Sequence, residues 1–202
     1  MKQTFRSKNM FVFAMVWAGF VFVNAVDLTL RYSGKSTLIA AAVLAAITAL
    51  VYAVAMRPAT VLEEDGLRVR NPFRTTFLPW ASIGGVSVSH SINVRHGEEM
   101  LRLWTPTSTA RERAKAQRRG AAPARRGRFR TEPALTKAEQ AAAEAFAGKT
   151  HADWVGDQIT ERVEAAKRRD EQPGPVTTAW AKDAFAVIAV AVALLIAALV
   201  IP

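Results

Sequence analysis

The chain has 202 residues and a net charge of +10, from 27 Lys and Arg against 17 Asp and Glu, and it contains no cysteine. The lack of cysteine excludes a disulfide scaffold, cysteine-bound zinc or iron–sulfur clusters, and thiol catalysis. Half of the residues are hydrophobic, which is too many for a disordered polar protein. The mean hydropathy is slightly positive at +0.09. In so charged a chain this indicates segregated apolar and polar segments, as in a membrane protein with one polar domain.

Three apolar segments are long enough to cross a bilayer: residues 10–26, 38–56 and 184–201. A helix needs about 20 residues to span a hydrocarbon core of about 30 Å. We therefore predict three transmembrane helices. A cleaved signal peptide is the alternative for the first segment, because basic residues precede it. Its apolar stretch is, however, longer than that of a usual signal peptide, which has about 7–15 residues.

The distribution of Lys and Arg predicts the orientation of these helices. Three basic residues, Lys2, Arg6 and Lys8, precede the first segment, whereas the loop at 27–37 has only two. We expect a multi-pass protein of the inner (plasma) membrane. The N-terminus and residues 57–182 would be cytosolic, and the short loop and the C-terminus would lie outside.

The expected fold class is membrane α+β, with a cytosolic antiparallel β module and an α-helical pair beside the three spans. The predicted divisions are a two-helix transmembrane hairpin (1–56), the β module (57–106), a basic flexible arm (107–133), amphipathic helices with a linker (134–182) and a C-terminal transmembrane helix (183–202).

Alternating side chains predict short strands in the β module. Leu67 and Val69 alternate with Arg68 and Arg70, the period-2 pattern of a half-buried strand, after a turn at Asp65-Gly66. Further strands are expected at 59–63, 74–78, 86–94 and 100–105, with a hairpin tip at 95–98. These elements predict a small antiparallel sheet or partial barrel.

The same residues carry a family resemblance, in four motifs with a set order and spacing. They are Arg57-Pro58, Asp65-Gly66-Leu67-Arg68-Val69-Arg70-Asn71, Arg74-Thr75 and Leu78-Pro79-Trp80. The stretch resembles the bacterial PH-like domain of small membrane proteins common in high-GC Gram-positive bacteria. The resemblance implies a PH-like sheet with further strands, a closing helix and a non-enzymatic role. It brings no catalytic residues.

The most basic part of the chain is residues 111–130, in which nine Lys and Arg face a single acid, Glu112. Ser108 could cap a short helix here, but glycine and proline favour a mobile arm. Within a Debye length of an anionic leaflet each such residue contributes up to about 1 kcal/mol of binding. The alternatives are a solvated run that sets topology and a nucleic-acid site, the latter disfavoured because only Phe129 interleaves. The candidate lipid or partner contacts are Arg111, Arg113, Arg118, Arg119, Arg125, Arg126, Arg128 and Arg130.

Two helices are expected after the arm. Thr136 and Glu139 fit a capping box for the first helix, and Thr150 with Asp153 offers a weaker one for the second. The second helix carries an apolar stripe that is assigned to partner docking or to sheet packing: Trp154, Val155, Ile159 and Val163.

No pattern for catalysis, metal binding or a cofactor is present. The leading hypothesis is a non-catalytic scaffold or accessory subunit that docks an unidentified protein partner. The alternative is a module that recognises anionic lipid headgroups at the inner leaflet through the arginine-rich arm. Within the sheet, Arg68, Arg70 and Arg74 are the only candidates for a headgroup pocket, and their other interpretation is the solvent face of the sheet.

Overall fold

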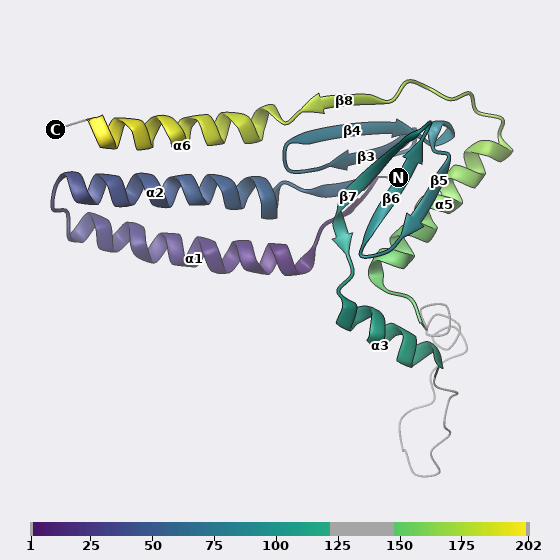
Figure 1. Ribbon diagram of the computed structural model, residues 1–202, viewed down its shortest axis with the longest axis horizontal. Coiled ribbons are helices and arrows are strands. Elements are labelled where there is room, and N and C mark those ends of the chain that lie inside the picture. The colour runs from purple at the N-terminus through teal and green to yellow at the C-terminus, as the bar shows by residue number, and fades with distance from the viewer. Residues whose placement is uncertain (1, 122–147, 201–202) are drawn as a thin grey trace, which may run out of the picture. The chain divides into compact units, whose positions relative to one another are not determined.

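The computed structural model describes residues 2–121 and 148–200. The chain divides into two compact units (Figure 1). The first comprises Met1–Pro79 with Gly174–Pro202, and the second is Trp80–Pro173. Antiparallel sheets and three long apolar helices are present, which confirms the coarse fold class.

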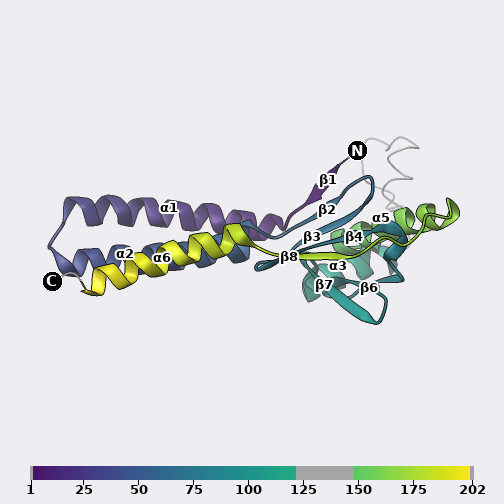
Figure 2. The same cartoon turned by 90° about the horizontal axis from the view of Figure 1, so that it is seen from above.

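Three helices of the first unit are long and apolar enough to cross a membrane. They are α1 (Lys8–Leu30), α2 (Lys35–Val51), which continues through a π-helical turn η1 (Tyr52–Met56), and α6 (Lys182–Val200). They run side by side in Figures 1 and 2. Each begins before the apolar segment predicted from sequence, because flanking polar residues continue the helix; Ser7, for example, caps α1 by accepting a hydrogen bond from the Met10 amide at 3.4 Å.

Small side chains let α2 and α6 pack closely. Ala49 and Ala53, on α2 and η1, are buried, as are Ala184 and Ala191 on α6. Ala53 and Ala184 belong to one apolar cluster with Ala181, against which Ile188 packs. Alanine lets helix backbones approach closely, so van der Waals contact can hold helices together without a hydrophobic driving force.

The first unit also contains an antiparallel five-stranded sheet with the order β1-β2-β3-β4-β8. Its strands are β1 (Gln3–Phe5), β2 (Ala59–Leu62), β3 (Gly66–Arg70), β4 (Arg74–Pro79) and β8 (Thr177–Trp180). The predicted strands near 59–63, 67–71 and 74–78 are confirmed. The two flanking strands, β1 and β8, were not expected, since segments of three and four residues carry no periodicity of their own.

The flanking strands constrain the topology of the helices. Strand β1 precedes α1, β2 follows α2, and β8 precedes α6. Thr4 pairs with Val61 on β2, and Thr76 on β4 pairs with Thr178 on β8. Because one sheet joins these segments, the chain before α1, after α2 and before α6 lies at the same end of the three helices.

The described part of the second unit contains a three-stranded antiparallel sheet on which helix α5 packs. The elements are η2 (Trp80–Ser82), β5 (Gly85–Val88), β6 (Ser91–His96), β7 (Glu99–Thr107) and α5 (His151–Arg168). The single strand expected at 86–94 is wrong, because the chain turns at Ser89 and His90, where the Ser108 hydroxyl donates to the Ser89 carbonyl at 3.1 Å. The hairpin tip at 95–98 is confirmed, with Gly97 at a φ of +58°.

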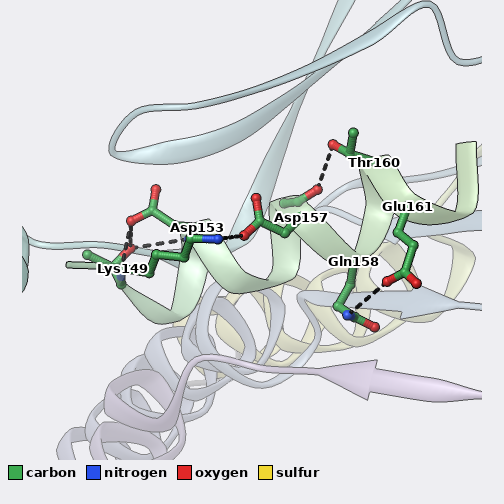
Figure 3. A network of polar contacts seen from close by, with 8 residues as sticks. Lys149, Asp153, Asp157, Gln158, Thr160 and Glu161 are labelled. Carbon is green, nitrogen blue, oxygen red and sulfur yellow. Dashed lines mark hydrogen bonds and ion pairs between the residues drawn. The ribbon is translucent and has the colours of Figure 1, made fainter. Parts of the chain in front are cut away.

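Helix α5 buries one face on this sheet and exposes the other. Val155 and Ile159 are fully buried, as are Ile92 and Leu103 of the sheet. The outer face carries polar pairs along the helix (Figure 3). The Lys149 ammonium lies 2.6 Å from the carboxylate of Asp157, and the Gln158 amide donates to Glu161 at 3.4 Å.

The start of α5 confirms one predicted cap. The Asp153 amide donates to the Thr150 hydroxyl at 3.2 Å, and the Thr150 amide donates to the Asp153 carboxylate at 2.8 Å. This is the reciprocal pairing of a capping box. The helix expected to begin near Thr136 lies outside the described residues.

Part of the expected flexible arm is a helix, α3 (Ala110–Ala121). Thr109 and Glu112 form a reciprocal cap at its start, with the Glu112 amide 3.1 Å from the Thr109 hydroxyl and the Thr109 amide 2.9 Å from the Glu112 carboxylate. These two satisfied amides favour a helix over the mobile arm predicted from glycine and proline. Residues 122–133 of the arm lie outside the described part of the chain.

Candidate functional site: an arginine pocket at the sheet end of the helices

The side chain of Arg57 is buried where α2 ends and β2 begins. It is only 7 % exposed, and its guanidinium makes polar contacts on every side. Nε lies 3.1 and 2.9 Å from the two carboxylate oxygens of Asp183. One terminal nitrogen donates to the Asn71 carbonyl, and the other donates to the Thr75 hydroxyl at 2.9 Å. Arg57 thus joins α2, α6 and the β3–β4 hairpin.

Local structure at the helix ends places these groups. The Arg57 amide donates to the Tyr52 carbonyl at 3.0 Å, which closes the π-helical turn η1. The Tyr52 hydroxyl lies 3.5 Å from an Asp183 carboxylate oxygen. Asp183 stands in the first turn of α6, where the helix dipole favours a negative charge.

A cavity of about 430 Å³ opens beside Arg57. Its wall is strongly basic, since four arginines line it with one carboxylate. The lining residues are Arg6, Tyr52, Met56, Arg57, Arg68, Arg70, Thr75 and Asp183, and we call this cavity the arginine pocket.

Two of the four arginines are neutralised by neighbouring acids and two are not. Arg57 is paired with Asp183, and Arg68 is paired with Glu63. Arg6 and Arg70 are exposed, and neither guanidinium group forms a hydrogen bond or an ion pair with any residue in the described ranges 2–121 and 148–200. Their guanidinium groups therefore remain available for an anionic ligand.

The pair of Arg68 and Glu63 is bidentate, with both nitrogen–oxygen distances at 2.9 Å. The hydrogen bonds from Arg68 hold the pKa of the Glu63 carboxyl below its usual value, and the nearby charge of Lys2 adds to this effect. The same contact raises the pKa of the Arg68 guanidinium. Arg68 also lies over the ring of Phe77, at 5.2 Å from its centroid, so its position is restrained from two directions.

Aromatic side chains gather where the sheet meets α6. Trp180 is 60 % exposed, and its ring lies 5.7 Å edge-on from that of Phe185. Phe73 lies 5.9 Å from Phe185 on the other side, and Arg74 stacks over Trp180 at 4.6 Å. Exposed aromatics beside an arginine are typical of the interface between membrane and water. Two residues of this cluster, Trp180 and Phe185, stand on either side of Asp183 in the sequence.

The structure separates the candidates predicted within the sheet. Arg68 and Arg70 line the arginine pocket, because they alternate with buried Leu67 and Val69 on β3. Arg74 does not line it and instead stacks on Trp180.

The arm arginines have different placements. Arg111 and Arg118 are exposed on α3. Arg113 instead donates to the Ser89 carbonyl and to the Ser108 hydroxyl, the latter at 3.1 Å, so it ties α3 to the β5–β6 turn. The side chain of Arg119 and all of Arg125, Arg126, Arg128 and Arg130 lie outside the described part of the structure.

The apolar stripe of α5 packs on the sheet rather than facing outward. Val155 and Ile159 are fully buried and Val163 is 3 % exposed. Trp154 is half-buried and stacks on His151 at 5.9 Å between ring centroids. Of the two roles predicted for the stripe, sheet packing is the one that these contacts support. Partner docking through the three buried side chains is corrected, because no partner can reach them in the folded unit.

Six of the eight residues that line the arginine pocket were not predicted from sequence as site residues: Arg6, Tyr52, Met56, Thr75, Arg57 and Asp183. A signal was present for the last two. Arg57 directly follows an apolar segment, and Asp183 is the only acid in residues 174–202. Charged residues at the edge of transmembrane segments are often functional or paired. Their pairing could not be read from residues so far apart in the chain.

Comparison with known families gives a match over residues 57–145 to the bacterial PH domain. No curated protein matches the chain, and no solved structure does. The match begins at Arg57 and includes strands β2 to β7, whereas β1, α5, β8 and the three long helices lie outside it. The predicted resemblance to a bacterial PH-like domain is thereby confirmed for residues 57–145, the part of the chain that the family match covers.

Proposed function

We propose that this protein is a non-catalytic module, anchored by three transmembrane helices, that binds the anionic headgroup of a membrane phospholipid in the arginine pocket. The observation that carries the proposal is the pair of unpartnered guanidinium groups, Arg6 and Arg70, in a cavity whose other arginines are already neutralised. The planar guanidinium group can donate two parallel hydrogen bonds to two oxygens of one phosphate, which makes arginine well suited to bind it.

The location of the pocket supports a ligand in the membrane. Arg6 immediately precedes α1, Arg57 follows α2, and Asp183 begins α6. All three ends therefore meet where the apolar helices give way to the sheet, beside the exposed ring of Trp180. Phosphate groups of a bilayer occupy the same boundary between hydrocarbon and water.

The distribution of basic residues indicates on which side of the membrane the pocket would lie. The pocket and the basic N-terminus lie at the same end of the helices, and the loop between α1 and α2 at the other end has few basic residues. The distribution of Lys and Arg favours the cytosolic side for the sheet. An inner leaflet with anionic lipids would then supply the ligand.

The pocket and the arm make competing predictions, which a charge-matched experiment separates. The full-length protein is purified in mild detergent, and its binding of phosphatidylglycerol or phosphatidylcholine is titrated by native mass spectrometry. We expect the double variant Arg6→Gln/Arg70→Gln to weaken phosphatidylglycerol binding roughly tenfold or more, because each lost charge-assisted hydrogen bond contributes about 1.5–3 kcal/mol.

The double variant Arg111→Gln/Arg118→Gln is the matched control. It removes the same charge from exposed positions on α3 and should leave the phosphatidylglycerol affinity within about twofold of the wild type, because neither arginine lines the arginine pocket. If the α3 variant loses binding and the pocket variant retains it, the arm is the lipid site and the proposal is overturned. Equal binding of both lipids by the wild-type protein would also overturn it.

A further inference from the structure

A groove of about 920 Å³ runs along α2 on the apolar side of the arginine pocket. Near the sheet its opposite wall is α6, with Val187, Val190 and Leu194. At the far end the wall is α1, with Val21 and Leu28. The groove is therefore formed by the three apolar helices, together with Tyr32 in the loop between α1 and α2.

The threonines of the groove add little polarity to it, because their hydroxyls already have hydrogen-bond partners within the protein. The Thr48 hydroxyl donates to the Leu44 carbonyl at 2.7 Å. The Thr29 hydroxyl donates to the Ala25 carbonyl at 2.6 Å. The hydroxyl of Thr37 shares a hydrogen bond of 3.1 Å with a serine in the loop between α1 and α2. These three threonine hydroxyls therefore need no hydrogen bond from a molecule in the groove, which favours an apolar occupant.

One residue belongs to both cavities. Tyr52 lines the groove and also lines the arginine pocket. Its hydroxyl lies 3.5 Å from the Asp183 carboxylate, among the charges of the pocket. Tyrosine is suited to such a boundary, because its ring is apolar and its hydroxyl is polar. The basic and apolar cavities thus adjoin at a single side chain.

We propose that the groove holds an acyl chain of the same phospholipid whose headgroup occupies the arginine pocket. This inference rests on the proposed headgroup site and extends it, since it makes the ligand a whole membrane lipid and not a soluble phosphate compound. The positive charge of the pocket favours an anionic lipid. Because Tyr52 lines both cavities, an acyl chain of that lipid can continue from the pocket into the groove along α2.

The dimensions of the groove suit this occupant. Along α2 its lining extends from Tyr52 to Thr37, which corresponds to about 22 Å at 1.5 Å per helical residue. One leaflet of the hydrocarbon core is about 15 Å deep, half of the full thickness. A chain that enters beside Tyr52 can therefore be accommodated over the whole depth of its leaflet.

The experiment compares a whole lipid with its headgroup alone, on the full-length protein in detergent. The probes are long-chain phosphatidylglycerol and glycerophosphoglycerol, the same headgroup without acyl chains. Ala45→Phe places a ring in the groove, which Ala45 lines. Ala40→Phe is the matched control on the same helix, because Ala40 lines a different hollow beside α1.

We expect Ala45→Phe to weaken binding of long-chain phosphatidylglycerol about tenfold and to leave the affinity for glycerophosphoglycerol unchanged. Ala40→Phe should change neither. A phosphatidylglycerol with a photoactivatable group on its acyl chain provides a second measurement on the wild-type protein, which does not depend on how the variant folds. Its label should fall on the peptides that contain Thr48 and Val190.

The outcomes distinguish the two proposals. If the Arg6→Gln/Arg70→Gln variant loses binding but Ala45→Phe does not, and the label falls outside the groove, the headgroup site stands and the acyl-chain inference is overturned. If the wild-type protein binds neither probe, both fail. If the wild-type protein is a dimer that Ala45→Phe dissociates, the groove is an interface between copies of the chain and the acyl-chain inference is likewise overturned.

Discussion

Arg57 and Asp183 form an ion pair of 2.9 Å that joins the end of the second long helix to the start of the third. The arginine is almost fully buried, whereas half of the aspartate side chain is exposed. Because a buried guanidinium is costly without a partner, this pair both aligns α6 on the sheet and keeps one arginine of the pocket neutralised. The remaining positive charge of the pocket is thereby left on Arg6 and Arg70.

Replacing Asp183 with asparagine should destabilise the protein. The variant removes the charge that faces the buried Arg57 and should lower the free energy of unfolding by about 1–3 kcal/mol. Thermal unfolding of the detergent-solubilised protein measures the effect. Asp170→Asn is the control, since Asp170 forms no ion pair within the described residues and has a φ of +53°, which asparagine adopts readily. Equal stability of the two variants would contradict the structural role of the ion pair.

The pair of Glu63 and Arg68 should make stability depend on acidic pH. The pKa of Glu63 is lowered in the folded protein by hydrogen bonds from Arg68, so the pair stabilises the fold above the ordinary glutamate pKa. That contribution disappears as the pH falls through the lowered value. At neutral pH we expect Glu63→Gln to cost about 1 kcal/mol, the upper end for a partly exposed pair.

The same variant provides the pH test. The difference in unfolding free energy between the wild type and Glu63→Gln should shrink to nearly zero once the pH is well below the ordinary glutamate value of 4.5. Glu98→Gln, at an exposed hairpin tip, should match the wild type throughout. If the difference in unfolding free energy between the wild type and Glu63→Gln stays constant from neutral to acidic pH, the ionisation of Glu63 does not contribute to stability.

The apolar stripe of α5 should behave as core. Ile159→Ala removes a fully buried side chain and should lower the unfolding free energy by about 2–5 kcal/mol. Glu161→Ala, on the exposed face of the same helix (Figure 3), should change it by less than about 0.5 kcal/mol. Chemical denaturation measures both variants. Full stability of Ile159→Ala would mean that the stripe does not pack on the sheet.

The turn before β3 should require glycine. A Cβ atom at Gly66 would collide with the Leu78 carbonyl oxygen and lie 2.8 Å from the Phe77 ring. Gly66→Ala should therefore cost about 1–3 kcal/mol of stability. At Gly84 the nearest atom would be at an ordinary 3.6 Å, so Gly84→Ala is the control for the loss of backbone freedom alone. If thermal unfolding shows the same loss of stability for Gly66→Ala and Gly84→Ala, the expected clash at Gly66 is contradicted.

Local pattern was sufficient for several elements. The three long helices follow from apolar composition over about 20 residues, a property of each segment alone. The β3–β4 hairpin follows from the alternation around Leu67 and from the Asp65-Gly66 turn. The cap of α5 follows from Thr150 and Asp153, three residues apart. Each of these signals lies within one element or one turn.

Other features depended on neighbours distant in the sequence. Strands β1 and β8 exist because the helices bring short segments beside β2 and β4, whose free edges supply the hydrogen bonds. Helix α3 begins at a cap formed by Thr109, whereas the sequence offered Ser108 as a cap and its glycines and proline favoured a mobile arm.

The arginine pocket shows the same division between sequence and tertiary structure. Arg57 and two residues that it bonds, Asn71 and Thr75, were visible in the sequence as parts of a family resemblance, which the family match over residues 57–145 supports. Their convergence on one guanidinium was not visible, and neither was Asp183, which lies 126 residues beyond Arg57. The sequence by itself determined the three long apolar helices, the hairpin and the basic character. Only the tertiary structure decided which charges neutralise each other. Ion pairing depends on the distance between groups in space, and it produces no periodic pattern in the sequence.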